Sequence, residues 1–244
     1  MDRKTQKVLG YDVDLMSFKE ALSFVEKKIN NNECLHVVTI NPEIIEFANK
    51  NKDFSEILKS ADFVIPDGVG IKIALKLKGI EQEQIPGIEF AKEAIKICEK
   101  NNKKIALIGA KEEIIQKATN NLKKEFPDLN ICFSHNGYFS KDYEEEIIKE
   151  LISSEPQLVL VALGAPKQDL FINSCKEIYP NAIYIGVGGS FDVWAGEVER
   201  APKAFRKIGC EWLYRTIKQP ERLKRIYKTL PLFLFKAIIE SIKK

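Results

Sequence analysis

The chain has 244 residues, of which 45% are hydrophobic and 30% charged, a composition that excludes an intrinsically disordered protein. The formal net charge is +3, but residues 196–244 hold 13 Lys and Arg against five Asp and Glu, a balance of +8, which leaves about −5 for residues 1–195. A basic tail on an acidic body predicts an anionic partner at the tail.

The cysteines and histidines favour a protein of the cytoplasm without a zinc site. The five cysteines are widely spaced, odd in number and never in a C-x-x-C pair, and there are only two histidines. Met1–Gly10 is polar and basic, so we expect no signal peptide. No apolar stretch reaches the roughly 20 residues that span a bilayer, and we expect any membrane contact to come from the cytoplasmic face.

Apolar runs alternate with amphipathic stretches along most of the chain. Runs typical of strands lie at Cys34–Ile40, Phe63–Ile65, Lys104–Ile108, Ile131–Phe133, Leu158–Leu163 and Ala182–Val187. Stretches typical of helices lie at Ser17–Asn30, Pro42–Lys50, Gly70–Lys78, Gly87–Lys100, Glu112–Glu125, Lys141–Ser153 and Lys167–Ile178. This alternation predicts an α/β fold with a Rossmann-like, mostly parallel sheet.

The pattern changes after about Gly196. Short basic, apolar-rich helices are predicted at Trp212–Lys218, Pro220–Tyr227 and Leu232–Ile242, with Pro220 and Pro231 as helix openers. We therefore expect a Rossmann-like domain over residues 1–195 and a basic amphipathic helical appendage over residues 196–244.

Two polar clusters follow early strands, where ligands bind in doubly wound sheets. Thr39 and Asn41 lie at the end of the strand Cys34–Ile40, and an equal alternative for Asn41 is to cap the next helix. Asp67 precedes a glycine after the next strand. It can act as a general base, although an ordinary Asp-Gly turn explains the pair taken alone.

Two further loops carry candidates for binding a phosphate or a sugar, through backbone N–H groups and a helix N-terminus. Neither matches the dinucleotide-binding or P-loop spacing, which weakens those two alternatives. Either loop taken alone is weak evidence. Their candidate residues are Gly164, Lys167, Gln168, Gly186, Gly188, Gly189 and Asp192.

The Asp12-Val13-Asp14 sequence has the Asp-x-Asp pattern with which many glycosyltransferases bind a divalent metal. It precedes the first helix rather than following a central strand, so a polar strand-end or capping role for Asp14 is the better interpretation. We predict no metal site.

The motifs match, in chain order, a known family over nearly the whole sequence. The matching stretches are Thr39-x-Asn41-Pro42-Glu43, Ala61-Asp62-x-x-x-Pro66-Asp67-Gly68, Gly164-x-Pro166-Lys167-Gln168, Gly186-Val187-Gly188-x-x-Phe191-Asp192-x-x-x-Gly196, Arg200-Ala201-Pro202, Gly209-x-Glu211-Trp212-Leu213-Tyr214-Arg215 and Pro220-x-Arg222-Leu223-x-Arg225. This ordered set resembles the WecG/TagA/CpsF glycosyltransferases, the N-acetylmannosaminyltransferase family of wall teichoic acid and enterobacterial common antigen synthesis.

The resemblance implies an inverting, metal-independent transfer that uses no cofactor. In the Gram-positive branch, N-acetylmannosamine would pass from UDP-ManNAc to the 4-hydroxyl of GlcNAc on undecaprenyl diphosphate, at the inner face of the cell membrane. It assigns Asp67 as the base, and it directs Arg215, Arg222 and Arg225 to the active site and the lipid diphosphate. We place Thr39, Asn41 and Gln168 with Asp67 in the catalytic group.

Two positions depart from the family pattern. Gln84 stands where the family often has an arginine, which puts a charge-based diphosphate contact there in doubt. Asp169 stands where the family usually has a glutamate, one methylene longer.

Other functions remain open at this point. One is a nucleotide-dependent dehydrogenase or epimerase on a similar sheet, and another is a non-enzymatic binder of an anionic ligand. A nucleic-acid partner is disfavoured because the tail is too apolar, as at Trp212, Leu232 and Phe235. The sequence leaves open the donor epimer, the polymer and the oligomeric state, a homo-oligomer included.

The position of Asp12-Val13-Asp14 leads to a direct prediction. Sugar transfer should continue in excess EDTA, because this carboxylate pair is poorly placed to hold a divalent ion and the chain has only two histidines. A strict requirement for Mg²⁺ or Mn²⁺, restored when the metal is added back, would contradict it.

Overall fold

The structure is a computed structural model that describes residues 3–202, 205, 214 and 223–242. The chain forms two compact units. Unit 1 takes in residues 1–19, 39–86 and 200–244, and unit 2 takes in residues 20–38 and 87–199. The strand β3 (Leu35–Ile40) begins in unit 2 and ends in unit 1.

Unit 2 is built on parallel strands joined by helices. Its elements are most of α1 (Phe18–Asn30), then α5 (Gly87–Lys100), β5 (Lys104–Gly109), α6 (Glu112–Glu125), β6 (Asn130–His135), α7 (Lys141–Ser153), β7 (Leu158–Ala162), α8 (Lys167–Ile178), β8 (Ile183–Gly186) and α9 (Ser190–Trp194). The sheet order is β4-β3-β8-β7-β5-β6, with β4 (Phe63–Pro66) contributed by unit 1. The pairings β3·β8, β8·β7, β7·β5 and β5·β6 are all parallel, which confirms the predicted Rossmann-like α/β fold.

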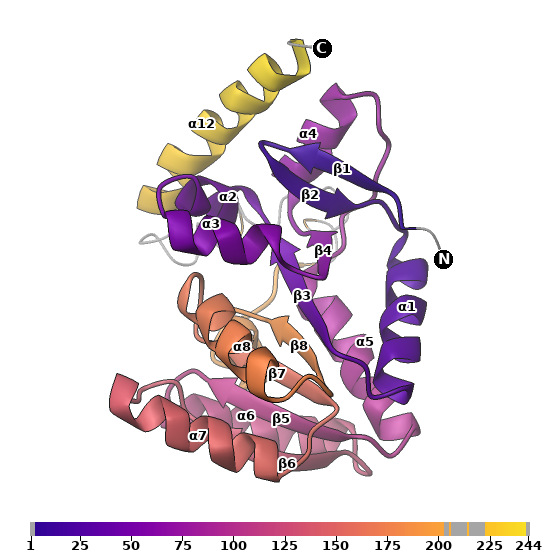
Figure 1. Ribbon diagram of the computed structural model, residues 1–244, viewed down its shortest axis with the longest axis vertical. Coiled ribbons are helices and arrows are strands. Elements are labelled where there is room, and N and C mark those ends of the chain that lie inside the picture. The colour runs from indigo at the N-terminus through magenta and orange to yellow at the C-terminus, as the bar shows by residue number, and fades with distance from the viewer. Residues whose placement is uncertain (1–2, 203–204, 206–213, 215–222, 243–244) are drawn as a thin grey trace. The chain divides into compact units, whose positions relative to one another are not determined.

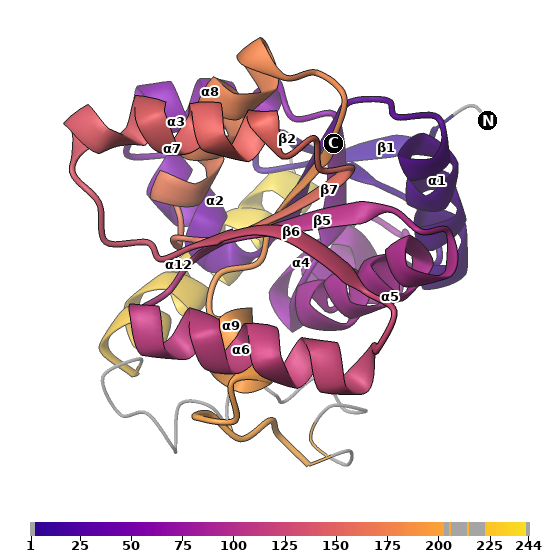
Figure 2. The same cartoon turned by 90° about the horizontal axis from the view of Figure 1, so that it is seen from below.

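Helices cover both faces of the sheet in unit 2 (Figure 2). On one face, Val159 and Tyr184 pack against Leu151 of α7 and Phe171 of α8. On the other face α5 contacts β5 and β7, and α6 contacts β5 and β6. Because neither face meets water, β7 is apolar at every position and completely buried.

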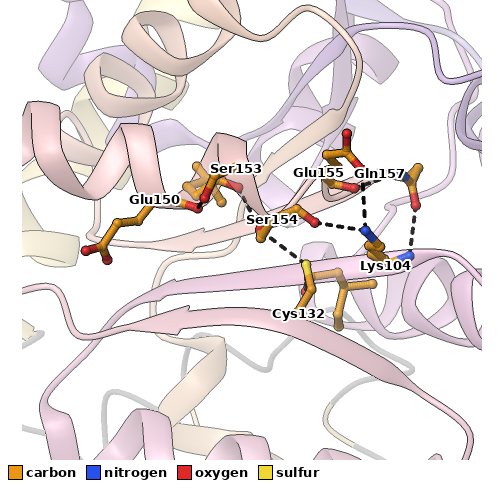
Figure 3. A network of polar contacts seen from close by, with 9 residues as sticks. Lys104, Cys132, Glu150, Ser153, Ser154, Glu155 and Gln157 are labelled. Carbon is orange, nitrogen blue, oxygen red and sulfur yellow. Dashed lines mark hydrogen bonds and ion pairs between the residues drawn. The ribbon is translucent and has the colours of Figure 1, made fainter.

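A polar network closes the amino end of the sheet in unit 2 (Figure 3). The backbone N–H of Lys104 donates to Oε1 of Gln157 at 2.9 Å, and Nζ of Lys104 donates to the Ser154 carbonyl at 3.3 Å. Cys132 Sγ donates to the Ile105 carbonyl at 3.3 Å. The network fixes the start of β5 and the connection from α7 to β7, at the edge opposite the strand ends that carry candidate site residues.

Unit 1 combines a hairpin with a small group of helices. Its elements, besides β4, are β1 (Thr5–Val8), β2 (Tyr11–Asp14), α2 (Pro42–Ala48), α3 (Lys52–Lys59), α4 (Val69–Leu77) and α12 (Leu223–Ile242). The strands β1 and β2 pair antiparallel around Leu9 and Gly10, both at positive φ. The C-terminal helix α12 lies against α2 and α4 (Figure 1).

Two ion pairs and a buried apolar face hold α12 in place. Lys236 Nζ donates to both carboxylate oxygens of Glu46 in α2, at 2.9 and 2.7 Å, and only 2% of the Glu46 side chain is exposed. Nζ of Lys78, just after α4, lies 2.7 Å from Oε2 of Glu240. Phe233 and Ala237 of α12 are completely buried.

The tail differs from its predicted helices. Pro231 lies inside the single helix α12 rather than at the start of a helix, so that prediction was wrong. Pro231 is on the exposed side of the helix, where water can bind the carbonyl that the missing N–H leaves unbonded. The predicted helix Trp212–Lys218 and the start at Pro220 fall outside the described residues. Within the described ranges, no helix combines the length and the apolarity needed to cross a bilayer.

Asp14 ends β2 as a buried structural residue, in keeping with its predicted strand-end role. Its Oδ2 accepts the Val64 N–H at 2.8 Å, its Oδ1 lies 3.4 Å from Arg3 Nε, and only 3% of the side chain is exposed. Burial raises the pKa of the Asp14 carboxyl above its ordinary value of 3.8, and the Val64 N–H and Arg3 only partly oppose this effect. Folded Asp14 therefore keeps its proton at pH values where the unfolded chain has lost it.

A pH series on Asp14→Asn tests this assignment. Between the unfolded and the folded pKa, the native state binds more protons, so the Asp14 contribution to the free energy of unfolding falls as the pH rises. The asparagine side chain of the variant does not titrate, yet it can still accept the Val64 N–H. The stability of the variant relative to wild type should therefore improve from about pH 4 towards neutral pH, measured by urea unfolding.

The control is Asp12→Asn, at an exposed carboxylate paired with Lys7. This variant should show no such improvement with rising pH. A stability difference between Asp14→Asn and wild type that is constant with pH, or that moves in the opposite direction, would contradict the assignment.

Candidate functional site

In unit 1, the ends of β3 and β4 bring Thr39, Asn41 and Asp67 together. The Asp67 N–H donates to the Ile40 carbonyl at 2.9 Å, which holds the two strand ends side by side. Thr39 is buried near the end of β3, while Asp67 is only half-buried. A hydroxyl, an amide and a carboxylate thus lie at the ends of neighbouring strands, as the sequence predicts.

Asn41 caps the helix that follows it. Its Oδ1 accepts the Ile44 N–H at 3.0 Å, so the capping alternative is confirmed for that oxygen. A Cβ on Gly68 would lie 3.9 Å from the Asn41 Cβ, which places the Asp67-Gly68 turn against Asn41. Gly68 has φ of +90°, a backbone angle that a larger residue would adopt only under strain.

The first turns of α2 and α4 pack directly on each other beside this cluster. A Cβ on Gly70 would lie 2.4 Å from Pro42 Cγ and 3.2 Å from Leu230 Cδ1 of α12. Only glycine permits this approach, so α12 reaches the helix start that directly follows Asp67. The segment before α5 also lies here, because the Ile85 N–H donates to the Pro66 carbonyl at 2.8 Å.

In unit 2, the ends of β7 and β8 form a second cluster around Gln168. The Val187 N–H donates to the Val161 carbonyl at 2.9 Å, so the two strand ends are adjacent. The Gln168 side chain lies across Gly186, where a Cβ would be 2.4 Å from its Nε2. Its Oε1 accepts the Gly188 N–H at 3.1 Å. A side chain at position 186 would therefore have to displace the Gln168 amide, a packing reason for Gly186 that its assignment to ligand contact did not include.

The other candidates of this cluster lie in the two loops and the first turns of their helices. A Cβ on Gly164 (φ +72°) or on Gly188 (φ +49°) would meet no atom within 4 Å, so both backbones face open space. Gly189 is the N-cap of α9, and Asp192 lies in that short helix. Lys167 is exposed in the first turn of α8. The exposed lysine and the start of α8 together favour an anion.

A buried histidine–carboxylate pair lies behind Gln168. Nε2 of His36 on β3 is 3.5 Å from Oδ1 of Asp169, the residue after Gln168, and the two side chains are 2% and 1% exposed. No pattern in the sequence joins these residues.

The sequence-based predictions also missed the Asn136-Gly137 turn, although an Asn-Gly pair directly after a strand is a usable signal for a turn. There the Gly137 N–H donates to the Ala110 carbonyl at 2.8 Å.

The structure describes the three predicted arginines only in part. Arg215 and Arg222 lie outside the described residues, and of Arg225 only the backbone, in the first turn of α12, is described. The part of the chain that is described contains no group of three His, Cys, Asp or Glu side chains suited to holding a metal ion.

The comparisons with known proteins agree with the motif order. The family model described as glycosyl transferase, WecG/TagA/CpsF family, matches residues 6–244. Proteins of Staphylococcus aureus strains MW2 and NCTC 8325, both named N-acetylglucosaminyldiphosphoundecaprenol N-acetyl-beta-D-mannosaminyltransferase, are 34% identical to this chain over 234 residues. These alignments cover 94% of this chain and 90% of each relative. The chain belongs to the WecG/TagA/CpsF family of glycosyltransferases.

Proposed function

We propose that the protein transfers N-acetylmannosamine from UDP-ManNAc to the 4-hydroxyl of GlcNAc on undecaprenyl diphosphate, with inversion at the anomeric carbon. The observation that carries this proposal is 34% identity, over 94% of the chain, to relatives named for that transfer. The same match favours a transferase over a dehydrogenase or epimerase, and over a binder without catalytic activity.

Asp67 is the proposed base. Inverting transfer is one in-line displacement, in which the acceptor oxygen attacks the anomeric carbon while the UDP oxygen leaves, and the hydroxyl proton must go to a nearby group. Asp67 is half-buried at the end of β4, next to the cap residue Asn41. Thr39 and Asn41 would orient the sugar hydroxyls around it.

The cluster at the ends of β7 and β8 is the proposed donor diphosphate site. Negative charge builds on the diphosphate as the bond breaks, and donors fixed in advance stabilise that charge. Lys167 supplies such a donor and the N-terminus of α8 a favourable field, while the backbone at Gly164 and Gly188 leaves room for the diphosphate, with Gln168 held between the loops and Gly189 at the start of α9. Asp192 is assigned to the same donor. No cofactor or metal takes part in this proposal.

Residues 196–244 are proposed to complete the site and to carry it to an anionic membrane surface. Arg215, Arg222 and Arg225 would bind the lipid diphosphate, for which the planar guanidinium is better suited than lysine. The outer face of α12 supports the membrane role: Phe235, Ile238, Ile239 and Ile242 are all exposed at helical spacing. On the adjacent α4, Ile73 and Leu77 are exposed beside Lys72 and Lys76.

Donor choice tests the proposed reaction directly. Radiolabelled UDP-ManNAc and UDP-GlcNAc are each offered with a synthetic polyprenyl-diphosphate-GlcNAc. Label should enter the lipid product from UDP-ManNAc. Transfer from UDP-GlcNAc alone would show that UDP-GlcNAc, and not UDP-ManNAc, is the donor. No transfer from either sugar nucleotide, together with binding of NAD(P) and not of UDP, would favour the dehydrogenase or epimerase.

Asp67→Asn should reduce turnover by roughly 10²- to 10⁴-fold, because the amide keeps the shape but cannot accept the proton. UDP affinity should change little, since the base acts on the acceptor. The matched control is Asp53→Asn, at an exposed carboxylate on α3 of the same unit, which should turn over like wild type. Near-normal turnover of Asp67→Asn would remove Asp67 from the role of base.

The double variant Phe235→Ser/Ile239→Ser should lose most of its binding to anionic vesicles, by about tenfold or more, because each lost apolar insertion is worth about 1 kcal/mol or more. Phe235 is 63% exposed and Ile239 38% exposed, so the thermal midpoint should fall only slightly. The control Ile178→Ser removes an apolar side chain that is 64% exposed at the end of α8, and it should sediment like wild type. Unchanged vesicle binding by the double variant would argue against the membrane face.

A further inference from the structure

The contact between His36 and Asp169 is almost completely buried in unit 2, and neither residue has a role in the proposed transfer. Asp169 is at the third position of α8 and His36 is in β3. A buried pair of this kind seldom adds stability over apolar side chains of similar size, because both groups lose their hydration. Its value must then come from the geometry that it imposes.

The geometry imposed is that of the first turn of α8. The N–H groups of Gln168 and Asp169 donate to the carbonyls of Gly164 and Pro166, at 2.9 and 3.1 Å. The contact of Nε2 with Oδ1 at 3.5 Å ties that turn to β3 through a side chain. The helix N-terminus adds a favourable field for the Asp169 carboxylate. Rotation of the first turn about the axis of α8 would therefore break the pair.

Gln168 is the residue that such a rotation would displace. Its amide occupies the space that a side chain at position 186 would need, because a methyl group at Gly186 would lie 2.4 Å from Nε2 and 2.9 Å from Cδ. In this space Oε1 accepts the Gly188 N–H at 3.1 Å, which fixes the loop between β8 and α9. A shift of about 1 Å is enough to lose a hydrogen bond of this kind.

We propose that His36 and Asp169 are positioning residues, which hold the Gln168 amide and, through it, the Gly188 loop in the shape that binds the donor diphosphate. Neither side chain touches substrate. The proposal rests on the proposed function only for the identity of the ligand. The arrangement of the loop is a property of the free protein.

The variants separate positioning from packing. Asp169→Asn keeps the size of the side chain and removes its charge. The double variant His36→Leu/Asp169→Leu replaces the pair by apolar groups, which should restore most of any lost stability. The matched control is Tyr184→Phe, which removes the 2.7 Å hydrogen bond from the Tyr184 hydroxyl to the Tyr179 carbonyl at the opposite end of α8.

Two measurements are made on each variant beside its thermal midpoint. UDP affinity by titration calorimetry should fall about tenfold in Asp169→Asn and in the double Leu variant, the loss expected when one hydrogen bond to a charged ligand is misplaced. Hydrogen exchange at the Gly188 amide should accelerate about tenfold in the same two variants. The Val187 amide, bonded to Val161, should be unaffected. Tyr184→Phe should change neither UDP affinity nor Gly188 exchange, whatever its thermal midpoint.

The proposal is overturned if the double Leu variant binds UDP and protects the Gly188 amide as wild type does, because packing alone would then suffice. It is also overturned if Tyr184→Phe produces the same losses, because a general loosening of α8 would explain them. If wild type does not bind UDP, the proposed function fails. Gly188 exchange in the same variants still decides whether the pair positions Gln168.

Discussion

Parallel strand pairing is the constraint on which the candidate site depends. In a parallel ladder every carboxyl end faces the same edge, so the loops that follow β7 and β8 are neighbours however far apart they lie in sequence. The register Val161↔Gly186 brings Gly164 and Gly188 within a few residues of a paired position. The helices that follow these strands, α8 and α9, then both begin at this edge of the sheet.

Buried ionisable side chains have different roles in the two units. In unit 1 it joins secondary structure elements: Glu46 would be a buried carboxylate without its lysine partner if α12 lacked Lys236, a situation that costs about 3–5 kcal/mol. The carboxylate of Glu240 accepts from the Leu9 N–H as well as pairing with Lys78, which ties the hairpin turn to the same helix. In unit 2 the buried pair lies directly behind a candidate ligand-binding side chain.

The sequence predicted the regular elements well, because their periodicity is set by local burial. The helices α5, α6, α7 and α8 have the predicted bounds, since each has one apolar face on the sheet and a polar outer face. Short elements such as α3, α9 and the β1–β2 hairpin were missed, because they span too few residues to show a period. Pro231 was misjudged because its tolerance depends on which side of α12 faces water, a tertiary property.

The sequence identified the candidate residues by their position at the ends of strands, but it did not predict the contacts between their side chains. Asn41 could be weighed as a cap because capping is local. The fit of Gln168 over Gly186 and the meeting of His36 with Asp169 depend on which strands pair, and no local pattern records that. Side-chain contacts between distant segments are the part of the site for which three-dimensional information is needed.

The contact between Gln168 and Gly186 also restricts how this protein can diverge. Any side chain at position 186 would have to displace the Gln168 amide and with it the hydrogen bond from the Gly188 N–H. A shorter residue at 168 would leave room for a methyl group at 186, but it would also lose the hydrogen bond from the Gly188 N–H. The effect of a substitution at either position should therefore depend on which residue stands at the other.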